Sequence, residues 1–365
     1  MRKIVTVIGA RPQFIKASAV SRALQYSGRL SEVLIHTGQH FDRNMSEVFF
    51  SELAMPAAKY NLGVHGGPHG AMTGRMLESI ERILVEENPD AVLIYGDTNS
   101  TLAGALAAAK LNIRVAHVEA GLRSFNMRMP EEINRILADR ISTWLFTPTE
   151  AAAQHLLSEG VVADQIIPVG DVMYDVARHF GARVNTAGGV LSRLRLSSRG
   201  YVLATVHRAE NTDDLARLEV IVTALTAVAR VLQLVWPLHP RTRGVLESNG
   251  LLDRLTAAGV HLIEPVGYLE MVQLEKYAAL VVTDSGGVQK EAYFFQVPCV
   301  TMRDETEWVE LVEAGWNRLA PPDDPDVVVA AIHNALGTRG REVSPYGDGD
   351  AADKIAARLV ADLGN

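Results

Sequence analysis

Short apolar runs alternate with helical patterns along the chain, and this alternation constrains the fold more than any other feature. In the first half, the strand-like runs are residues 3–8, 33–36, 91–95, 114–118, 144–147 and 165–169. In the second half, they are residues 201–206, 233–238, 261–265, 280–283 and 299–302. Strands that alternate with helices over this length predict parallel, doubly wound sheets of the α/β class.

The alternation is interrupted between residues 183 and 200, where Gly, Ser and Arg are frequent. We interpret this stretch as the linker region and predict two Rossmann-like domains, residues 1–170 and 171–350, that face a central cleft. A chain of 365 residues with 48% hydrophobic residues has enough apolar surface for a core in each domain. An amphipathic pattern over residues 351–363 predicts a final helix, and we expect residues 351–365 to pack back on the first domain.

Composition excludes several classes of protein. The net charge of −8, from 35 basic and 43 acidic residues, argues against general binding to nucleic acid or to anionic membranes. A single cysteine, Cys299, excludes an internal disulfide and a multi-cysteine metal cluster. The apolar run at the N-terminus is too short for a signal peptide, and no stretch reaches the roughly 20 residues that a membrane span needs. We therefore expect a cytoplasmic protein.

Three acidic residues lie at predicted strand ends and at a helix start in the segment 95–135. Asp97 and Glu119 each follow a predicted strand, and Glu131 belongs to the first turn of a helix that begins at Pro130. Taken singly, each acid has a structural interpretation, as a helix cap, a loop residue or a charge at a helix N-terminus. Because the ends of parallel strands meet at one edge of a sheet, the three together predict a carboxylate site for acid/base chemistry.

The helix that begins at Pro130 has an apolar stripe. The stripe consists of Ile133, Ile136, Leu137 and Ile141. Glu131 and Arg135, one turn apart, lie on the opposite side of the helix. We expect the stripe to pack on the core, and the Glu131 and Arg135 pair to face either solvent or a ligand cleft.

The stronger of two candidate phosphate loops lies in the second half. Ser285, Gly286 and Gly287 open a helix directly after the strand at 280–283. Glycines let a diphosphate approach backbone N–H groups, and a helix N-terminus favours negative charge. Glu291, about one turn further on, is a candidate ligand of ribose hydroxyls, and its interpretation as an exposed helix acid is equally consistent with the sequence.

The other candidate loop is GARPQFIK, after the first strand. Pro12 suits the first position of a helix, so that Arg11 and Lys16 lie near a positive helix end where either side chain can reach an anion. A lone arginine at a strand end is more often a solvated charge. The segment lacks the G-x-G-x-x-G pattern, and a nicotinamide cofactor is therefore not predicted.

Two histidines follow strands of the second half. His207 follows the first of these strands and His239 the next. A histidine at a strand end suits acid/base or phosphate chemistry, and we rank His207 above His239. No HExxH motif or paired-histidine spacing is present, so that we expect metal-free chemistry.

Eight segments of the chain then point to a family. They are GARPQFIK, TGQHFD, YGDTNST, HVEAGLRS, MPEEINR, TVHRAENT, TDSGGVQKEA and TMRDETE, in this order. With them the chain resembles the non-hydrolysing UDP-N-acetylglucosamine 2-epimerases over almost its whole length. The resemblance implies a GT-B fold, with UDP held mainly by the second domain and the sugar facing the first. It also implies a homodimer, no redox cofactor, and interconversion of UDP-N-acetylglucosamine and UDP-N-acetylmannosamine by elimination of UDP to a glycal and re-addition.

The resemblance also implies roles for single residues. The family's catalytic carboxylates fall on Asp97, Glu119 and Glu131, and its cleft histidine on His207. Its nucleotide contacts fall on Arg11, Lys16, Ser285, Gly286, Gly287 and Glu291, with Arg135 beside the sugar.

The chain departs from the family pattern in several places. Trp308 stands where many bacterial members have an arginine that contacts the phosphates, and Met271 where several have an aromatic residue near the uracil. The segment QHFDRNM differs from the activator-binding segment of many bacterial enzymes, and allosteric activation by substrate is therefore not predicted. The segment SFNMRMPEEINR also resembles relatives that act on UDP-2,3-diacetamido sugar acids. Alternatives to the main hypothesis are thus a 2-epimerase of UDP-2,3-diacetamido-glucuronic acid, a retaining glycosyltransferase, or a nucleotide-sugar sensor without catalysis.

Overall fold

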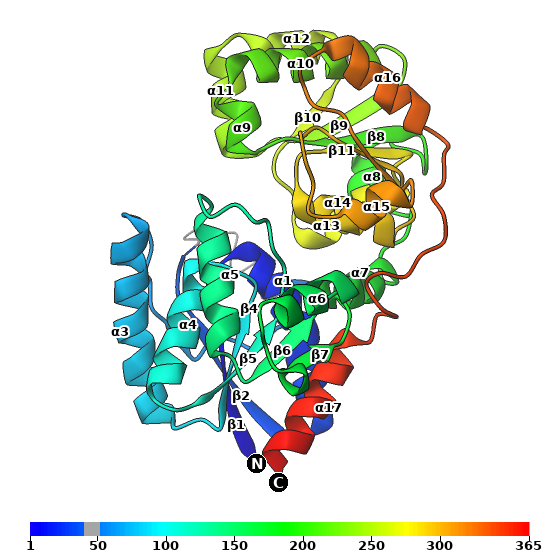
Figure 1. Ribbon diagram of the computed structural model, residues 1–365. Coiled ribbons are helices and arrows are strands. Elements are labelled where there is room, and N and C mark those ends of the chain that lie inside the picture. Colours follow the sequence, from blue (N-terminus) through cyan, green and yellow to red (C-terminus); the bar gives the residue numbers. More distant parts are fainter. Residues whose placement is uncertain (40–51, 365) are drawn as a thin grey trace. The chain divides into compact units, whose positions relative to one another are not determined.

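The chain folds into two α/β domains, which the computed structural model describes over residues 1–39 and 52–364 (Figure 1). The N-terminal domain comprises Met1–Val176 and Ser344–Asn365, and the C-terminal domain comprises Ala177–Val343. The chain first passes from one domain to the other within a single helix, α7 (Val172–Gly181).

The N-terminal domain is built on a parallel sheet with the strand order β3-β2-β1-β4-β5-β6-β7. Its strands are β1 (Arg2–Ile8), β2 (Leu30–His36), β3 (Tyr60–Asn61), β4 (Ala91–Tyr95), β5 (Arg114–Val118), β6 (Trp144–Thr147) and β7 (Ile166–Pro168). Its helices in the described ranges are α1 (Arg11–Ser27), α3 (His69–Glu87), α4 (Asn99–Lys110), α5 (Pro130–Ile141), α6 (Glu150–Ser158), the 3₁₀ turn η1 (Ala163–Gln165), the first half of α7, and α17 (Ala351–Gly364). Strands such as β4 are buried along their whole length, as expected for a parallel sheet with helices on both faces.

The last helix, α17, belongs to the N-terminal domain, where it packs against α1 (Figure 1). Ile355, Leu359 and Leu363 are buried one turn apart, which is the apolar stripe of an amphipathic helix. The backbone N–H groups of Ala351 and Ala352 donate to the carboxylate of Asp175 at 3.2 and 2.7 Å. Burial of this carboxylate, reinforced by the nearby acids Asp171 and Asp350, raises the pKa of Asp175 to about 6.

The C-terminal domain repeats the same topology with the strand order β10-β9-β8-β11-β12-β13. Its strands are β8 (Tyr201–Thr205), β9 (Gln233–Pro237), β10 (His261–Ile263), β11 (Leu280–Thr283), β12 (Cys299–Thr301) and β13 (Asn317–Leu319). Its helices are the end of α7, α8 (Gly189–Leu194), α9 (Ala209–Thr212), α10 (Leu215–Ala229), α11 (Pro240–Ser248), α12 (Leu251–Ala257), α13 (Tyr268–Tyr277), α14 (Gly286–Phe294), α15 (Val309–Glu313) and α16 (Pro325–Ala335). One core, around Trp236, lies under α10 and α16, and a second, around Tyr201, lies under α8 and α13.

The expectation that residues 183–200 form a linker is wrong. This stretch includes α8, whose Val190 and Leu191 are buried in the C-terminal core next to Tyr201. The side chain of Gln273 fixes the start of α8, because its Oε1 accepts from the Val190 N–H at 3.0 Å. The frequent Gly, Ser and Arg residues therefore mark turns around a packed helix.

Two short strands, β3 and β13, were not predicted from the sequence. Each has two or three residues and lies at the edge of its sheet, where a continuous apolar run is not needed. The segments TGQHFD and QHFDRNM extend into residues 40–51, outside the described residues. Among the described residues, no helix is long and apolar enough to cross a membrane.

Candidate active site

One buried glutamine joins two strand ends of the N-terminal sheet. Gln13, in the first turn of α1, is 1% exposed. Its Oε1 accepts from the N–H groups of Gly9 and Ala10 at 2.8 and 3.0 Å, and its Nε2 donates to the Tyr95 carbonyl at 2.8 Å. The loop after β1, which leads into Arg11 at the start of α1, is thus held beside the loop after β4, which carries Asp97.

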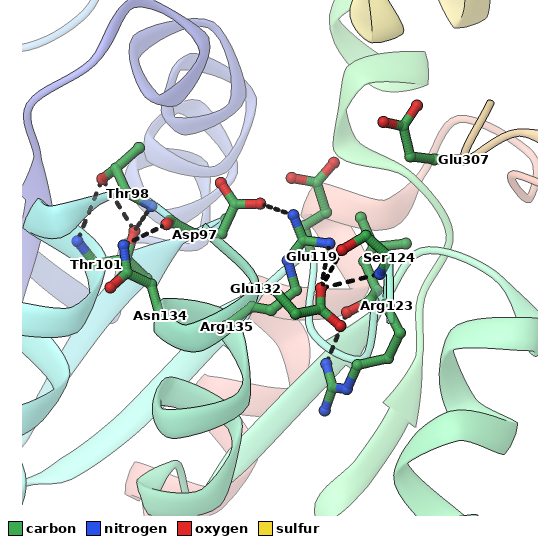
Figure 2. Close-up of polar contacts among 12 residues, drawn as sticks. Asp97, Thr98, Thr101, Glu119, Arg123, Ser124, Glu132, Asn134, Arg135 and Glu307 are labelled. Atoms are coloured by element: carbon green, nitrogen blue, oxygen red, sulfur yellow. Dashed lines mark hydrogen bonds and ion pairs between the residues drawn. The ribbon is translucent and has the colours of Figure 1, made fainter. Parts of the chain in front are cut away.

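Asp97 lies in the turn between β4 and α4 and forms an ion pair with Arg135 of α5 (Figure 2). It does not cap α4, because Thr98 is the N-cap and accepts from the Thr101 N–H. Desolvation of the half-buried Asp97 carboxyl raises its pKa above the ordinary value, although the positive charges of Arg135 and Lys16 oppose this shift. A raised pKa brings an aspartate closer to the range in which it can both take and return a proton.

Glu119 follows β5 and forms an ion pair with Lys16 of α1. Its backbone is left-handed, with φ of +69°, a conformation that is rare for a residue with a side chain. The neighbouring turn has a glycine, Gly96, with φ of +61°. A Cβ atom there would lie 3.4 Å from the Glu119 carboxylate and 3.5 Å from the Lys16 ammonium. The two acids and their two cations therefore share one small region, and Figure 2 shows Asp97, Glu119 and Arg135 gathered there.

The prediction that the whole apolar stripe of α5 packs on the core is wrong, although Ile141 does pack against it. Ile133 and Leu137 of the expected core stripe are 40% and 46% exposed, whereas Arg135 is buried with 9% exposure. Glu132 is also buried and accepts from the N–H groups of Ser124 and Phe125, both at 2.9 Å. The helix turns its polar side inward because the loops after β4 and β5 present charged and backbone partners there, and such pairing makes burial of polar groups tolerable.

Glu131, the third predicted acid, is placed differently from the other two. It lies in the first turn of α5 and is partly exposed. Its side chain has no hydrogen-bond or ion-pair partner within residues 1–39 and 52–364. Its catalytic role stays a prediction, while Arg135, predicted to lie beside the sugar, is positioned by Asp97 and by Glu132 at 3.1 Å.

A buried charge network lies beneath the two acid-bearing turns, and sequence reasoning missed it. His117 of β5 is fully buried between the Asp139 carboxylate and the Gly96 carbonyl, each at 2.7 Å. The other oxygen of Asp139 accepts from Arg123 at 2.7 Å, and Arg123 in turn forms a bidentate pair with Glu159. The sequence signal was present in the histidine of HVEAGLRS, a polar residue among the apolar residues Val115, Ala116 and Val118 of β5.

In the C-terminal domain, a buried aspartate organises the loop that carries His207. Asp284, directly after β11, is 0% exposed and accepts from the N–H groups of His207 and Arg208 at 3.0–3.1 Å. Asn211 also donates to it at 3.1 Å, and the His207 ring lies 3.3 Å away. Burial favours the neutral acid, but the donors from His207, Arg208 and Asn211 outweigh it and hold the pKa of Asp284 below its ordinary value.

The predicted phosphate loop lies at the start of α14. Ser285 is the N-cap residue, and its side chain makes no capping hydrogen bond, so that the first N–H groups of the helix are not capped by it. Around Gly287, open space surrounds the position of a Cβ atom. Glu291, inside the helix, is 7% exposed and accepts from the Tyr268 hydroxyl at 3.3 Å. The suggestion that Glu291 is an exposed helix acid is therefore wrong.

Trp308, the departure from the family pattern, packs on this helix. Its Nε1–H donates to the Gly286 carbonyl at 2.9 Å, and the Lys290 ammonium lies 4.1 Å from the ring centroid. His239, the lower-ranked histidine, accepts from the Arg241 N–H and so caps α11. This capping contact is the structural role expected of a residue just before a helix.

The structure has two parallel doubly wound sheets. Acids follow strands of one sheet, and a helix start without a side-chain cap follows a strand of the other. These features define an α/β enzyme of the GT-B fold. The profile of the family described as UDP-N-acetylglucosamine 2-epimerase matches residues 22–360. The chain belongs to this family and is an isomerase of the epimerase class. The fold class, family and enzyme class expected from the sequence are thereby confirmed.

Relatives and solved structures cover nearly the whole chain. It is 55% identical to UDP-2,3-diacetamido-2,3-dideoxy-D-glucuronate 2-epimerase of Pseudomonas aeruginosa, over 98% of this chain and 99% of that relative. It is 43% identical to UDP-N-acetylglucosamine 2-epimerase of Methanocaldococcus jannaschii over the same shares. The crystal structure of a Methanocaldococcus jannaschii UDP-GlcNAc 2-epimerase with UDP-GlcNAc and UDP aligns with a TM-score of 0.89, covering 98% of this chain and 99% of that one.

Proposed function

We propose that the protein epimerises C2 of a UDP-activated 2-acetamido sugar, using carboxylates of the N-terminal domain as the acid and base. The observation that carries this proposal is the pairing of Asp97 and Glu119, two acids with cationic partners at adjacent strand ends. Inverting a carbon centre requires a proton to leave one face and arrive at the other. Two carboxylates near each other can perform these two steps, which a single one cannot do without moving.

The reaction we propose has two halves. The C2 proton of the sugar is not acidic by itself, because C2 is not next to a carbonyl group. In the first half, a carboxylate takes this proton while the C1–O bond breaks, its electron pair leaves with UDP, and a C1–C2 double bond forms. In the second half, the UDP oxygen adds back to C1 and a carboxylic acid delivers a proton to the opposite face of C2. The sequence is redox-neutral, so that no hydride acceptor is consumed.

The leaving diphosphate needs positive charge and N–H donors. We assign this role to the N-terminus of α14, with Ser285, Gly286 and Gly287, and to Arg11 and Lys16 of α1. His207, ordered by Asp284 beneath it, is a further donor to the diphosphate. Lys16 also counters the charge of Glu119, which couples diphosphate binding to the charge of one of the two acids.

The remaining assignments concern the sugar and the nucleoside. We assign Arg135 to the sugar, Glu291 to the ribose hydroxyls, and Glu131 to acid/base chemistry beside Asp97 and Glu119. Arg135 is already oriented by Asp97 and Glu132, which is the kind of support that positions a substrate contact.

Two substrates are supported by different relatives. The 55% identity to the Pseudomonas aeruginosa enzyme favours UDP-2,3-diacetamido-2,3-dideoxy-D-glucuronate. The 43% identity to the Methanocaldococcus jannaschii enzyme supports UDP-N-acetylglucosamine, the substrate placed first by the sequence motifs. We rank the diacetamido sugar acid first, because the higher identity extends over an equal share of the chain.

Incubation of the protein with each UDP-sugar separately in deuterated water, followed by NMR, tests this proposal. We expect deuterium at C2 and a mixture of both C2 epimers, with faster turnover of the diacetamido sugar acid. Unchanged protons at C2 for both sugars would refute the epimerase assignment and leave a nucleotide-sugar sensor. Release of a free sugar would indicate hydrolysis. Faster turnover of UDP-N-acetylglucosamine would reverse the ranking of the two substrates.

Assembly and location complete the proposal. We propose that the protein is a homodimer, as the resemblance implies. We also propose that it is located in the cytoplasm, in line with the buried thiol of Cys299, which is not in a disulfide. Light scattering at several protein concentrations tests the dimer, and a mass of one chain at all of them would refute it.

A further inference from the structure

The histidine beneath the acids, His117, has an acceptor at both ring nitrogens. Its Nε2 faces the carbonyl oxygen of Gly96 at 2.7 Å. A carbonyl can only accept, so that Nε2 must carry a hydrogen. Its Nδ1 faces Oδ1 of Asp139, also at 2.7 Å. The protonation of Nδ1 therefore depends on whether Asp139 is ionised.

The surroundings of Asp139 favour the ionised form. Its Oδ2 accepts from Arg123 Nη1 at 2.7 Å and from the Gly121 N–H at 3.2 Å. The guanidinium is always charged, and a carboxylate that receives several donors is stabilised as the anion. An ionised carboxylate can only accept, so that the geometry calls for a hydrogen on Nδ1 of His117 as well as on Nε2.

The two backbone groups that this pair holds flank the two candidate acids. Gly96, whose carbonyl His117 holds, directly precedes Asp97. Gly121, whose N–H Asp139 holds, lies two residues after Glu119. Gly121 has φ of +81°, and a Cβ atom there would lie 2.3 Å from the Ala152 carbonyl oxygen, so that this turn fits only without a side chain.

We propose that His117 and Asp139 form a buried imidazolium–carboxylate pair that positions the Asp97 and Glu119 turns relative to each other. Both members are positioning residues, because their ring and carboxylate atoms contact backbone groups and Arg123. Misplacing a reacting group by about 1 Å can cost roughly 10²-fold in rate, which is the scale on which such a support acts. This inference rests on the proposed function for its effect on turnover, whereas the charge state of the pair can be measured without any substrate.

The first experiment measures ring protonation by ¹⁵N NMR of the whole protein at neutral pH. An ordinary histidine is mostly neutral there. We expect both nitrogens of His117 to be protonated, and only one after Asp139→Asn, because the asparagine amide can donate to Nδ1 and keep every hydrogen bond with a neutral ring. A singly protonated His117 in the unchanged protein would overturn the charged pair.

The second experiment compares kcat and KM for the UDP-sugar that turns over. His117→Gln is expected to lower kcat by at least about tenfold with KM changed less than about threefold, since the acids are misplaced while the start of α14, assigned to the diphosphate, belongs to the other domain. Asp139→Asn should stay within about tenfold of the unchanged protein, because its hydrogen bonds persist. Val115→Ala, a buried apolar position on the same strand, serves as the control for general loosening of β5.

The outcomes separate the two proposals. Lack of turnover in the unchanged protein contradicts the proposed function, whereas normal kcat in a folded His117→Gln protein contradicts the positioning role. An equal loss of kcat in His117→Gln and Val115→Ala would also contradict it. If His117→Gln does not fold, Asp139→Asn carries the test. A kcat of this variant more than tenfold below that of the unchanged protein, with the His117 ring still doubly protonated, overturns the inference.

Discussion

Asp97 and Asp284 occupy equivalent places in the two domains and differ in what surrounds them. Asp97 follows β4, the neighbour of β1, and Asp284 follows β11, the neighbour of β8. The side chain of Asp97 is 30% exposed and has Arg135 as its ion-pair partner, and desolvation raises its pKa. The side chain of Asp284 is fully buried, which opposes ionisation, but the His207 ring, the Arg208 N–H and the Asn211 amide outweigh burial and lower its pKa.

The difference shows that the role of an acid at a strand end depends on the hydrogen-bond donors around its carboxylate. A carboxylate saturated by fixed N–H groups is held as an anion and serves as a brace for the loop above it. A carboxylate that has lost water without gaining as many donors has a higher proton affinity, which suits proton transfer. Under the proposed function, the same residue type at the same topological position serves chemistry in one domain and structure in the other.

The largest effect is expected for Asp97→Asn. Asparagine keeps the size of the side chain and its acceptor for Arg135, but it cannot take a proton. We expect kcat to fall by at least about 10²-fold, the scale of general acid/base removal, with an unchanged thermal midpoint. Steady-state kinetics and circular dichroism measure the two quantities. Asp164→Asn, at an exposed position of η1, is the matched control and should have normal kcat.

Asp284→Asn should show the opposite pattern, a loss of stability rather than a loss of kcat. The amide offers one acceptor oxygen where the carboxylate offers two charged ones to the His207 and Arg208 backbone. We expect the free energy of unfolding to fall by about 2–3 kcal/mol, the range for hydrogen bonds to a charged group. Urea titration measures this loss. A protein of full stability with kcat as low as that of Asp97→Asn would break the comparison, because Asp284 would then act in the chemistry.

Asp175 tests whether backbone N–H donors alone are sufficient to keep the pKa of a buried carboxylate low. It accepts two backbone N–H groups, as Asp284 does, but its charged neighbours are acids, and its pKa is raised to about 6. The folded state therefore binds more protons than the unfolded state between the ordinary pKa and about 6, and stability should fall as the pH rises through this window. We expect a loss of roughly 3 kcal/mol, since the pKa is raised by about two units and each unit corresponds to about 1.4 kcal/mol. Urea titrations across this pH range should show a flatter dependence for Asp175→Asn than for the unchanged protein.

The smallest effect concerns the pH dependence of turnover. Because the pKa of Asp97 is raised, the acidic limb of kcat/KM should lie above the ordinary aspartate range, with activity lost as the pH falls. Arg135→Gln removes a charge that lowers this pKa, so that the limb should move to higher pH by about one unit. A limb that does not move would show that another group sets it. Initial rates over a series of buffers at constant ionic strength measure the limb.

Much of the fold follows from apolar runs in the sequence. The strands at Ala91–Tyr95 and Leu280–Thr283 were predicted at their observed bounds because every residue in them is buried. Tyr60–Asn61 was not predicted, because a two-residue edge strand has no periodicity to detect. The segment around α8 was misjudged because a short helix between turns has the composition of a linker.

The candidate site was predictable only in part. Asp97 and Glu119 are visible in the sequence because each directly follows an apolar strand. The inward side of α5 was predicted wrongly because hydrophobic periodicity assumes that a helix buries its apolar residues. Glu132 and Asp139 are instead buried by partners outside the helix, in the preceding loop and in β5. Such pairings depend on tertiary distances, which periodicity does not contain.

The left-handed backbone of Glu119 has a consequence for protein engineering. A residue with a side chain pays about 1–2 kcal/mol for this conformation, whereas glycine adopts it freely. A search for substitutions that relieve backbone strain would therefore select Glu119→Gly, which removes the carboxylate and leaves Lys16 without this partner. Thermostabilised variants of this chain should accordingly be screened for turnover as well as for melting temperature.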